Sequence, residues 1–337
     1  MRAVGFTANL PISDPEALLD LDLPEPGLPT GRDLLVRVRA VSVNPRDAKS
    51  RLGLPASPDK PVVAGYDASG VVEAVGPDAT LFRAGDEVFY AGTLDRPGSN
   101  AEWQLADERI VGRKPASLDH KAAASLPLTA LTAWEMLFDR LAIPRGSGEG
   151  EALLMLGGAG GVPSIAIQLA WLMTKLTVIG TASRPESAGW VRHLGAHQVV
   201  DHSRPLAEQV KALGVGQVRY VFSTHTDAQA WAEIAKLIAP QGRFGLIDDP
   251  DPLDLRLFKF KSVSIHWEAM FTRPMFRTAD MVRQHEILSE VASLVDTGGL
   301  RATIGQDFGP MNAVNLRRAH AAVEAGSTVG KIVLDGF

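Results

Sequence analysis

The chain has 337 residues, 45% of them hydrophobic, and a formal net charge of −5 at pH 7. This length predicts about two domains, and the slight negative charge gives no reason to expect a nucleic-acid partner. Cysteine is absent, which excludes disulfides and zinc sites built on thiolates.

The N-terminus and the most apolar stretch both favour a cytoplasmic protein with no membrane partner. Met1-Arg2-Ala3-Val4 leads into strand-like sequence rather than into a secretory leader. Residues 153–173 approach the length of a membrane span, but a glycine cluster and Pro163 divide them into a strand and a helix.

The first third of the chain is rich in short strand patterns separated by turns. Leu34, Val36, Val38 and Ala40 alternate with other residues along one strand, as expected for a strand with one buried face. Further short strands are expected at 71–76 and 86–89, between glycine turns. This spacing predicts a compact, barrel-like β domain.

From about residue 122 the pattern changes to alternating helices and strands, beginning with a helix at 124–137. Six strands are expected, at 153–156, 176–181, 198–201, 219–223, 242–247 and 262–265. Strands that alternate with helices predict a doubly wound sheet. An amphipathic helix follows at about 287–295, and the final strand, 331–334, needs a sheet to join and is expected to return to the first domain.

The glycine cluster Gly157 to Gly161 lies between the first of these strands and a helix. Glycines let the backbone turn sharply and approach a pyrophosphate, and the amides and dipole at the helix start favour the anion. The match to G-x-G-x-x-G is imperfect, because Pro163 follows Gly160 three residues later; proline is tolerated in a first helical turn. A turn without a ligand remains the alternative.

The end of the next strand points to NADP(H). Units that bind NAD usually carry an acid there for the ribose hydroxyls, whereas this chain has Ser183 and Arg184. Arg184 could bind a 2′-phosphate through charge-assisted bonds of about 1.5–3 kcal/mol each. Arg184 could instead be a solvated loop cation. Glu186 is the nearest acid to this strand end, and it could instead be a favourable charge in the first turn of the following helix.

The sequence resembles the medium-chain dehydrogenase/reductase superfamily, specifically its metal-free quinone oxidoreductase branch. Matching segments are 41–47, 65–72, 126–134, the glycine loop and 330–334, and the stretch 264–273 resembles a subgroup often labelled zinc-type alcohol dehydrogenase-like. The resemblance implies an α/β protein with a GroES-like β-rich catalytic domain at 1–123 and 266–337, a Rossmann NADP-binding domain at 124–265, and a homodimer.

By the same resemblance, the positions of the catalytic zinc ligands correspond to Asn44, Tyr66 and approximately Leu128. An amide, a phenol and an alkyl group cannot build a tetrahedral zinc site, so no metal is expected. Without a Lewis acid, acceptors that are already electrophilic are favoured. We therefore expect hydride transfer from NADPH to a quinone or an α,β-unsaturated carbonyl. The alternatives are an NADPH-binding structural or regulatory protein and a zinc-dependent alcohol dehydrogenase.

Three residues are predicted to act in catalysis. Tyr66 would donate a hydrogen bond to the acceptor or stack on it, unless it is a packing tyrosine. Asn44 would be an amide donor, and Asp47 either takes part in the chemistry or caps the next helix. Asp67 is expected to have a structural hydrogen-bonding role. His266, Trp267 and Phe271 are expected to line the acceptor site, with packing as the alternative.

The remaining predictions concern the cofactor. Ser187 stands where many quinone reductases place a phosphate-binding lysine, which leaves Arg184 as the expected phosphate ligand. For Thr132 the alternative is an ordinary helical residue, and for Lys331 it is an exposed strand cation. His202 and His225 could instead be surface histidines. The predicted cofactor-binding residues are Thr132, Gly158, Ala159, Gly160, Gly161, Val162, Ser183, Arg184, His202, Thr224, His225 and Lys331.

Overall fold

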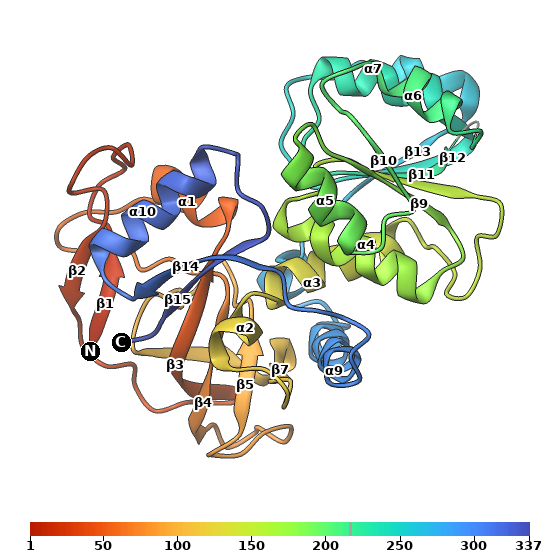
Figure 1. Ribbon diagram of the computed structural model, residues 1–337. Helices are drawn as coiled ribbons and strands as arrows, with labels where there is room; N and C mark the ends of the chain where they lie inside the picture. Colours follow the sequence, from red (N-terminus) through yellow and green to blue (C-terminus); the bar gives the residue numbers. More distant parts are fainter. Residues whose placement is uncertain (216–217) are drawn as a thin grey trace. The chain divides into compact units, whose positions relative to one another are not determined.

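A computed structural model describes residues 1–215 and 218–337. The chain divides into two compact units, one formed by 1–131 and 271–337 and the other by 132–270. The boundaries expected from the sequence, 123/124 and 265/266, precede the observed ones by eight and five residues. Figure 1 shows a β-rich unit and a unit in which helices flank a sheet.

The β-rich unit is built around a sheet of seven strands. Its strand order is β14-β15-β3-β4-β5-β7, with β6 also paired to β3. The strands are β3 (Asp33–Val43), β4 (Ala68–Val75), β5 (Glu87–Tyr90), β6 (Trp103–Asp107), β7 (Val111–Arg113), β14 (Ile304–Pro310) and β15 (Lys331–Asp335). β1 (Arg2–Gly5) and β2 (Leu19–Asp22) form a separate antiparallel pair. Strand β15 pairs antiparallel with β3, so the prediction that the C-terminal strand joins the first domain is confirmed.

Strand β3 shows why this sheet forms where the pattern predicts it. Leu34, Val36, Val38 and Ala40 are all buried, while Arg37 and Arg39 between them are exposed. Side chains alternate across a strand, so one face of β3 lies in the core and the other meets water. The helices of this unit are α1 (Pro45–Gly53), α2 (His120–Ala124), α8 (Thr272–Phe276), α9 (Arg283–Asp296) and α10 (Ala313–Glu324), with a short 3₁₀ turn at Glu108–Ile110. Helix α3 (Pro127–Trp134) contains the boundary between the units.

The second unit has six strands, all parallel to their neighbours, in the order β10-β9-β8-β11-β12-β13. The strands are β8 (Ala152–Met155), β9 (Thr177–Thr181), β10 (Gln198–Val200), β11 (Val218–Ser223), β12 (Ile238–Leu246) and β13 (Ser264–Trp267). The helices are α4 (Gly161–Met173), α5 (Pro185–His193), α6 (Leu206–Ala212) and α7 (Ala228–Leu237), with a π-helical segment at Glu135–Arg140 and a 3₁₀ segment at Leu255–Lys261.

This strand order confirms the predicted doubly wound sheet. The chain starts in the middle at β8, adds β9 and β10 on one side, and then returns to add β11, β12 and β13 on the other. The order therefore reverses between β8 and β11. In open sheets of this kind, ligands bind at the carboxyl ends of the strands on either side of such a reversal.

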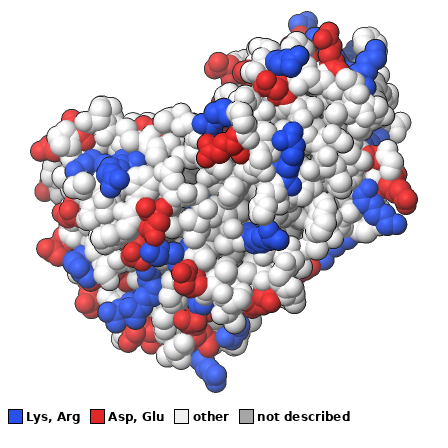
Figure 2. Space-filling view, viewed as in Figure 1, with Lys and Arg blue, Asp and Glu red and all other residues white. Residues whose placement is uncertain are grey.

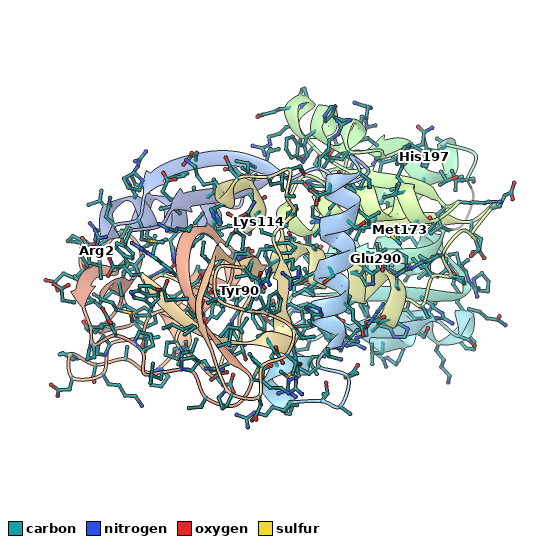
Figure 3. All side chains as sticks on the ribbon, turned by 90° about the horizontal axis from the view of Figure 1, so that it is seen from below. Arg2, Tyr90, Lys114, Met173, His197 and Glu290 are labelled. Carbon is teal, nitrogen blue, oxygen red and sulfur yellow. The ribbon has the colours of Figure 1, made fainter. Side chains whose placement is uncertain are left out.

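In the face shown in Figure 2, basic and acidic residues are interspersed on each unit. Figure 3 shows side chains throughout both units, with Tyr90 inside the β-rich unit, where it is buried, and exposed Arg2 at its edge. Among the described residues, no helix has both the length and the apolar character that a membrane crossing requires.

Candidate functional site

A buried polar cluster brings together residues from the N-terminal and C-terminal segments of the β-rich unit. It consists of Asn44, at the end of β3, Asp67, just before β4, and Lys331, the first residue of β15. None of the three is more than 3% exposed. The Nζ atom of Lys331 donates to the Oδ1 atom of Asn44, to the carbonyl of Val43 at 3.0 Å and to Oδ2 of Asp67 at 3.1 Å. Each donor of the ammonium group is thereby used within the protein.

The Asp67 carboxylate is held by several further donors. Its Oδ2 accepts from Nδ2 of Asn44 at 2.8 Å, and its Oδ1 accepts from the backbone amide of Leu128 at 2.8 Å. Burial raises the pKa of Asp67, while Lys331 and the two amides lower it part of the way back. A buried charge costs free energy unless it is paired and hydrogen-bonded, and both conditions hold here. This placement agrees with a structural role for Asp67.

Asp47 lies in the first turn of α1 and is 1% exposed. Its Oδ2 accepts from the backbone amide of Asn44 at 2.7 Å, which is the helix-capping contact that the sequence left open. Burial raises the pKa of Asp47 to about 7, although the Asn44 amide and Lys331 oppose the shift. A carboxyl group with such a pKa can hold or release a proton near neutral pH.

Tyr66 is buried, and its hydroxyl lies 2.8 Å from Oγ of Ser50. Its ring packs edge-on against Phe271, with centroids 5.4 Å apart. Burial raises the pKa of Tyr66, with Asp47 adding to the shift, while Ser50 and Arg46 oppose it. The phenol therefore stays protonated at neutral pH. Because either oxygen can be the donor, Ser50 can donate to Tyr66 and leave the phenol proton available to another acceptor.

These residues do not suit a metal ion. Among the residues that the structure describes, no three His, Asp or Glu side chains are grouped so that they could hold one. Asn44 and Asp67 already bind the Lys331 ammonium, which contributes a positive charge where a cation would need negative or neutral donors. The donor set at the expected ligand positions therefore does not fit zinc.

Two positions of the glycine loop in the second unit have no space for a side chain. Gly157 has φ +77°, and a Cβ atom there would lie 2.3 Å from Oγ1 of Thr224. A Cβ atom on Gly158 would lie 2.7 Å from the Thr181 carbonyl. Glycine is therefore required at both positions. The first helical bond of α4 runs from the Ser164 amide to the Gly160 carbonyl, so the amides of Gly161 and Val162 have no acceptor inside the helix.

The carboxyl edge of the parallel sheet is hollowed beside this loop. A cavity of about 140 Å³ there is lined by Gly157, Thr181, His202 and His225, among others. They follow or end four neighbouring strands, β8, β9, β10 and β11. The fold thus brings Gly157, His202 and His225 to one cavity, whereas Gly158 to Val162, Ser183, Arg184 and Thr224 are not part of its lining.

Ser183 and Arg184 are exposed directly after β9, and Arg184 is the N-cap residue of α5. Ser187 fixes this turn, because its Oγ accepts from the Arg184 amide at 3.3 Å and donates to the Arg184 carbonyl at 3.0 Å. Ser187 therefore has a capping role at the start of α5. Arg184 lies at the strand end where the adenosine ribose of a dinucleotide binds in folds of this type.

The other predicted residues are distributed between the units. Phe271 belongs to the β-rich unit and contacts Tyr66, whereas His266 and Trp267 end β13 in the second unit. Trp267 is 61% exposed and donates from Nε1 to the Asp248 carbonyl. Burial lowers the pKa of His266. Thr132 is buried within α3.

Two contributors were missed by the sequence analysis. Ser50 contacts the Tyr66 hydroxyl, and only its position one turn after Arg46 and Asp47 in the α1 pattern could have suggested it. Arg204 lines the cavity at the carboxyl edge, two residues after His202. The polar run 201–204 after a predicted strand was a usable signal, because residues at that position face the ligand edge of a doubly wound sheet.

Comparisons with known proteins agree with this architecture. Residues 30–116 match a family model described as alcohol dehydrogenase GroES-like domain, and residues 194–334 match one described as zinc-binding dehydrogenase. The chain is 38% identical over 338 residues to a zinc-type alcohol dehydrogenase-like protein of Staphylococcus aureus strain MSSA476, covering 99% of this chain and 100% of the relative.

Several solved structures are similar to this chain over nearly its whole length. A protein from Rhizobium etli, provisionally described as a zinc-dependent alcohol dehydrogenase, is 58% identical with a TM-score of 0.96 and covers 100% of this chain and 98% of its own. A quinone oxidoreductase from Pseudomonas syringae is 25% identical, with a TM-score of 0.82 and 99% coverage of both chains. A mycobacterial protein solved in complex with NADPH is 27% identical, with a TM-score of 0.83, and covers 99% of this chain and 100% of its own.

Proposed function

The chain belongs to the medium-chain dehydrogenase/reductase superfamily, among its zinc-type alcohol dehydrogenase-like members, and we propose that it is an NADPH-dependent reductase of quinones or α,β-unsaturated carbonyls that works without a metal ion. The superfamily makes it an oxidoreductase. The proposal adds the acceptor class and the preference for NADPH over NADH.

The observation that carries the proposal is the closed cluster of Asn44, Asp67 and Lys331. A metal ion polarises an alcohol or carbonyl oxygen by several kcal/mol, and in this cluster a lysine ammonium binds Asn44, one of the three positions that correspond to metal ligands. Quinones and enones need less polarisation, because the negative charge that develops on hydride addition delocalises to oxygen. A hydrogen bond to that oxygen is then sufficient help from the protein.

NADPH, when bound, supplies the hydride from C4 of its nicotinamide. We propose that Tyr66 donates a hydrogen bond to the acceptor oxygen, since its raised pKa keeps the phenol protonated and Ser50 can occupy its lone pair. Asp47, with its pKa near 7, would hold the proton that the reduced product takes up. Lys331 keeps the Asn44 amide in place, and Asn44 would provide a second polar contact.

For the cofactor, the proposal assigns the pyrophosphate to the Gly157–Gly161 loop and the first turn of α4. Space requires glycine at Gly157 and Gly158, and the helix start supplies amides and a positive dipole end. Arg184 would bind the 2′-phosphate together with Ser183. The cavity with His202, Arg204 and His225 would receive the adenosine end, where the guanidinium of Arg204 favours a phosphate. The NADPH complex of the mycobacterial protein supports this choice.

The test is stopped-flow oxidation of NADPH by the purified protein in the presence of a quinone and enone panel. Rapid turnover of at least one acceptor is expected, and zinc analysis of the same sample should find well below one zinc per chain. Tight NADPH binding without turnover on any acceptor would favour a structural or regulatory protein. About one zinc per chain, with activity lost on chelation, would favour the alcohol dehydrogenase alternative.

Two further proposals follow from the family. We propose a homodimer, as is common among relatives, and a cytoplasmic location. Light scattering on a size-exclusion column tests the first, because a monomer at micromolar concentration would contradict it. Fractionation of the source cells tests the second.

A further inference from the structure

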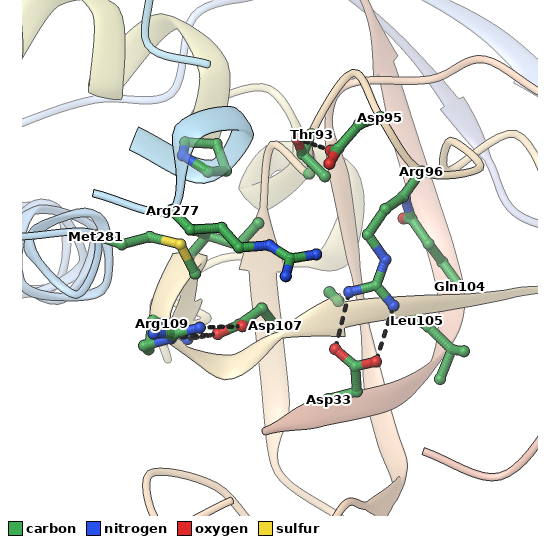
Figure 4. A pocket seen from close by; sticks show the side chains of 14 residues that line it. Asp33, Thr93, Asp95, Arg96, Gln104, Leu105, Asp107, Arg109, Arg277 and Met281 are labelled. Atoms are coloured by element: carbon green, nitrogen blue, oxygen red, sulfur yellow. Dashed lines mark hydrogen bonds and ion pairs between the residues drawn. The ribbon is translucent and has the colours of Figure 1, made fainter. Parts of the chain in front are cut away.

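Aspartates beside the cavities of this protein bind two different kinds of donor. In the wall of a cavity of about 360 Å³ in the β-rich unit, Asp33 binds the side chain of Arg96 through two bonds. Asp107 binds the side chain of Arg109 in the same way (Figure 4). These aspartates form ion pairs. Asp248, in the second unit, follows β12 and binds a neighbouring loop of the chain instead.

The carboxylate of Asp248 fixes the β11 loop, which is formed by residues 223–226 at the end of β11. Its Oδ2 accepts from the backbone amide of Thr226 at 2.5 Å, and its Oδ1 lies 3.2 Å from Oγ1 of Thr226. The Thr226 hydroxyl donates to Oγ of Ser223 at 2.9 Å, and Ser223 donates in turn to the His225 carbonyl at 2.8 Å. Ser223 and Thr226 are at most 3% exposed. Shielding from water strengthens such bonds, so the network holds the backbone at His225 in place.

The β11 loop lies against the two features proposed to bind the dinucleotide. Oγ1 of Thr224 donates to the Leu156 carbonyl at 3.2 Å, and a Cβ atom on Gly157 would lie 2.3 Å from this oxygen. The β11 loop therefore contacts the start of the glycine loop. His225 lines the cavity of about 140 Å³ at the carboxyl edge. Asp248 is outside that lining, so its carboxylate would act on a bound adenosine through the β11 loop.

Asp248 is itself anchored to the far side of the sheet. Its carbonyl accepts from Nε1 of Trp267, the last residue of β13, at 3.2 Å. Nearby, the Leu246 carbonyl at the end of β12 accepts from the Glu268 amide at 3.1 Å. The segment that carries Asp248 is thus tied to β13, and its carboxylate reaches the β11 loop from a fixed position.

From these contacts we propose that Asp248 is a positioning residue for the dinucleotide, because it holds the β11 loop in the conformation that receives the adenosine end. The inference rests on the proposed function, which puts the cofactor at this edge of the sheet. A loop that is already ordered avoids the cost of ordering on binding. The 2′-phosphate is assigned to Arg184 rather than to the β11 loop, so loss of Asp248 should weaken NADPH and NADH by similar factors.

Two substitutions separate the hydrogen bonds of Asp248 from its charge. Asp248→Ala removes both contacts to Thr226. Asp248→Asn can keep them, because its amide oxygen can accept from the Thr226 backbone and its NH₂ group can donate to the Thr226 hydroxyl. That hydroxyl still has its own proton to donate to Ser223.

Asp254→Ala is the matched control in the same unit. The Asp254 carboxylate also accepts from a backbone amide, that of Arg256 at 3.0 Å. Its carbonyl also accepts from a tryptophan, through Nε1 of Trp231 at 3.0 Å. Asp254 therefore has the same kinds of contact as Asp248 but none with the β11 loop among the bonds of its described carboxylate.

The assay is isothermal titration calorimetry of the full chain with NADPH and with NADH, together with Tm. Asp248→Ala should raise the Kd for both nucleotides at least about fivefold, as for a lost hydrogen bond to a charged group. Asp248→Asn and Asp254→Ala should stay within about twofold of the wild type. Without nucleotide, amide hydrogen exchange in the peptide 222–228 should be faster in Asp248→Ala and unchanged in Asp248→Asn.

Several results would overturn the inference. They are an unchanged Kd in Asp248→Ala, an effect on NADPH alone, and an equal loss of affinity in Asp248→Asn or in Asp254→Ala. A fall in Tm of more than about 10 °C in Asp248→Ala would make Asp248 a structural residue and would overturn it too. A wild type that binds neither nucleotide would refute the proposed function itself, whereas normal wild-type binding with an unchanged Asp248→Ala refutes only the role of Asp248.

Discussion

Replacing Lys331 by Met tests whether the buried cluster is an ion pair that stabilises the fold. Methionine keeps most of the side-chain volume but removes the ammonium that binds Asn44, Val43 and Asp67. Asp67 is fully buried, so its carboxylate would then be uncompensated. Removing one partner of a buried pair costs about 3–5 kcal/mol, a large part of the roughly 5–15 kcal/mol by which domains are stable.

The assay is urea unfolding of the wild type, Lys331→Met, Asp67→Asn and the double variant. Lys331→Met should lower the free energy of unfolding, and the double variant should recover more than half of that decrease, because no buried charge is left without a partner. The sign of the pH dependence follows from the Asp67 pKa. Burial already raises it and Lys331 lowers it, so Lys331→Met should raise it further. The loss should therefore be larger near pH 8 than near pH 5, where Asp67 can take up a proton. The reasoning would be refuted if Lys331→Met lowered the free energy of unfolding by less than about 1 kcal/mol. It would also be refuted if the decrease were the same near pH 5 and near pH 8.

Four further predictions concern the proposed cofactor and catalytic residues. Arg184→Ala should raise the KM for NADPH at least about tenfold and leave that for NADH nearly unchanged; equal effects on both would remove the phosphate assignment. Tyr66→Phe should lower kcat about 100-fold with little change in NADPH binding, and unchanged turnover would make Tyr66 a packing residue. Because the pKa of Asp47 is raised to about 7 from 3.8, its contribution to stability is full below about pH 4 and lost as pH rises through 7. Urea titrations should thus show Asp47→Asn losing less stability than the wild type between about pH 5 and pH 8, and parallel profiles would contradict this. Gly158→Ala should weaken NADPH binding and lower Tm, because its Cβ would lie 2.7 Å from the Thr181 carbonyl; Gly189→Ala, which meets nothing within 4 Å, is the matched control, and equal effects would exclude a steric cause.

Local patterns were sufficient for the fold because each one reports burial directly. Alternation along β3 placed Leu34 and Val36 in the core, and the strand–glycine–helix order around Gly157 fixed the turn before α4. The boundaries were less accurate. Strand β13 runs from Ser264 to Trp267 rather than over 262–265, because Ser262 has positive φ and ends the preceding 3₁₀ segment.

The candidate site was only partly predictable. Motif position pointed to Asn44, Asp47, Tyr66 and Lys331. The order of residues did not indicate that Lys331 binds Asn44, which lies 287 residues earlier in the chain. The expectation for Lys331 was a cofactor contact, whereas the structure places its ammonium on protein oxygens. That pairing exists because β15 returns to β3, which brings the two residues together.

The sequence by itself determined the two-part organisation, the parallel sheet and the absence of thiolate ligands, since these depend on residue type and on periods of two to four residues. The tertiary structure decided which polar groups are buried together. It raised the pKa of Asp47 to about 7 and brought the ammonium of Lys331 against Asn44 and Asp67. The physical reason is that desolvation and pairing depend on the distance between groups in space, and residues far apart in a chain acquire that distance only through the complete fold.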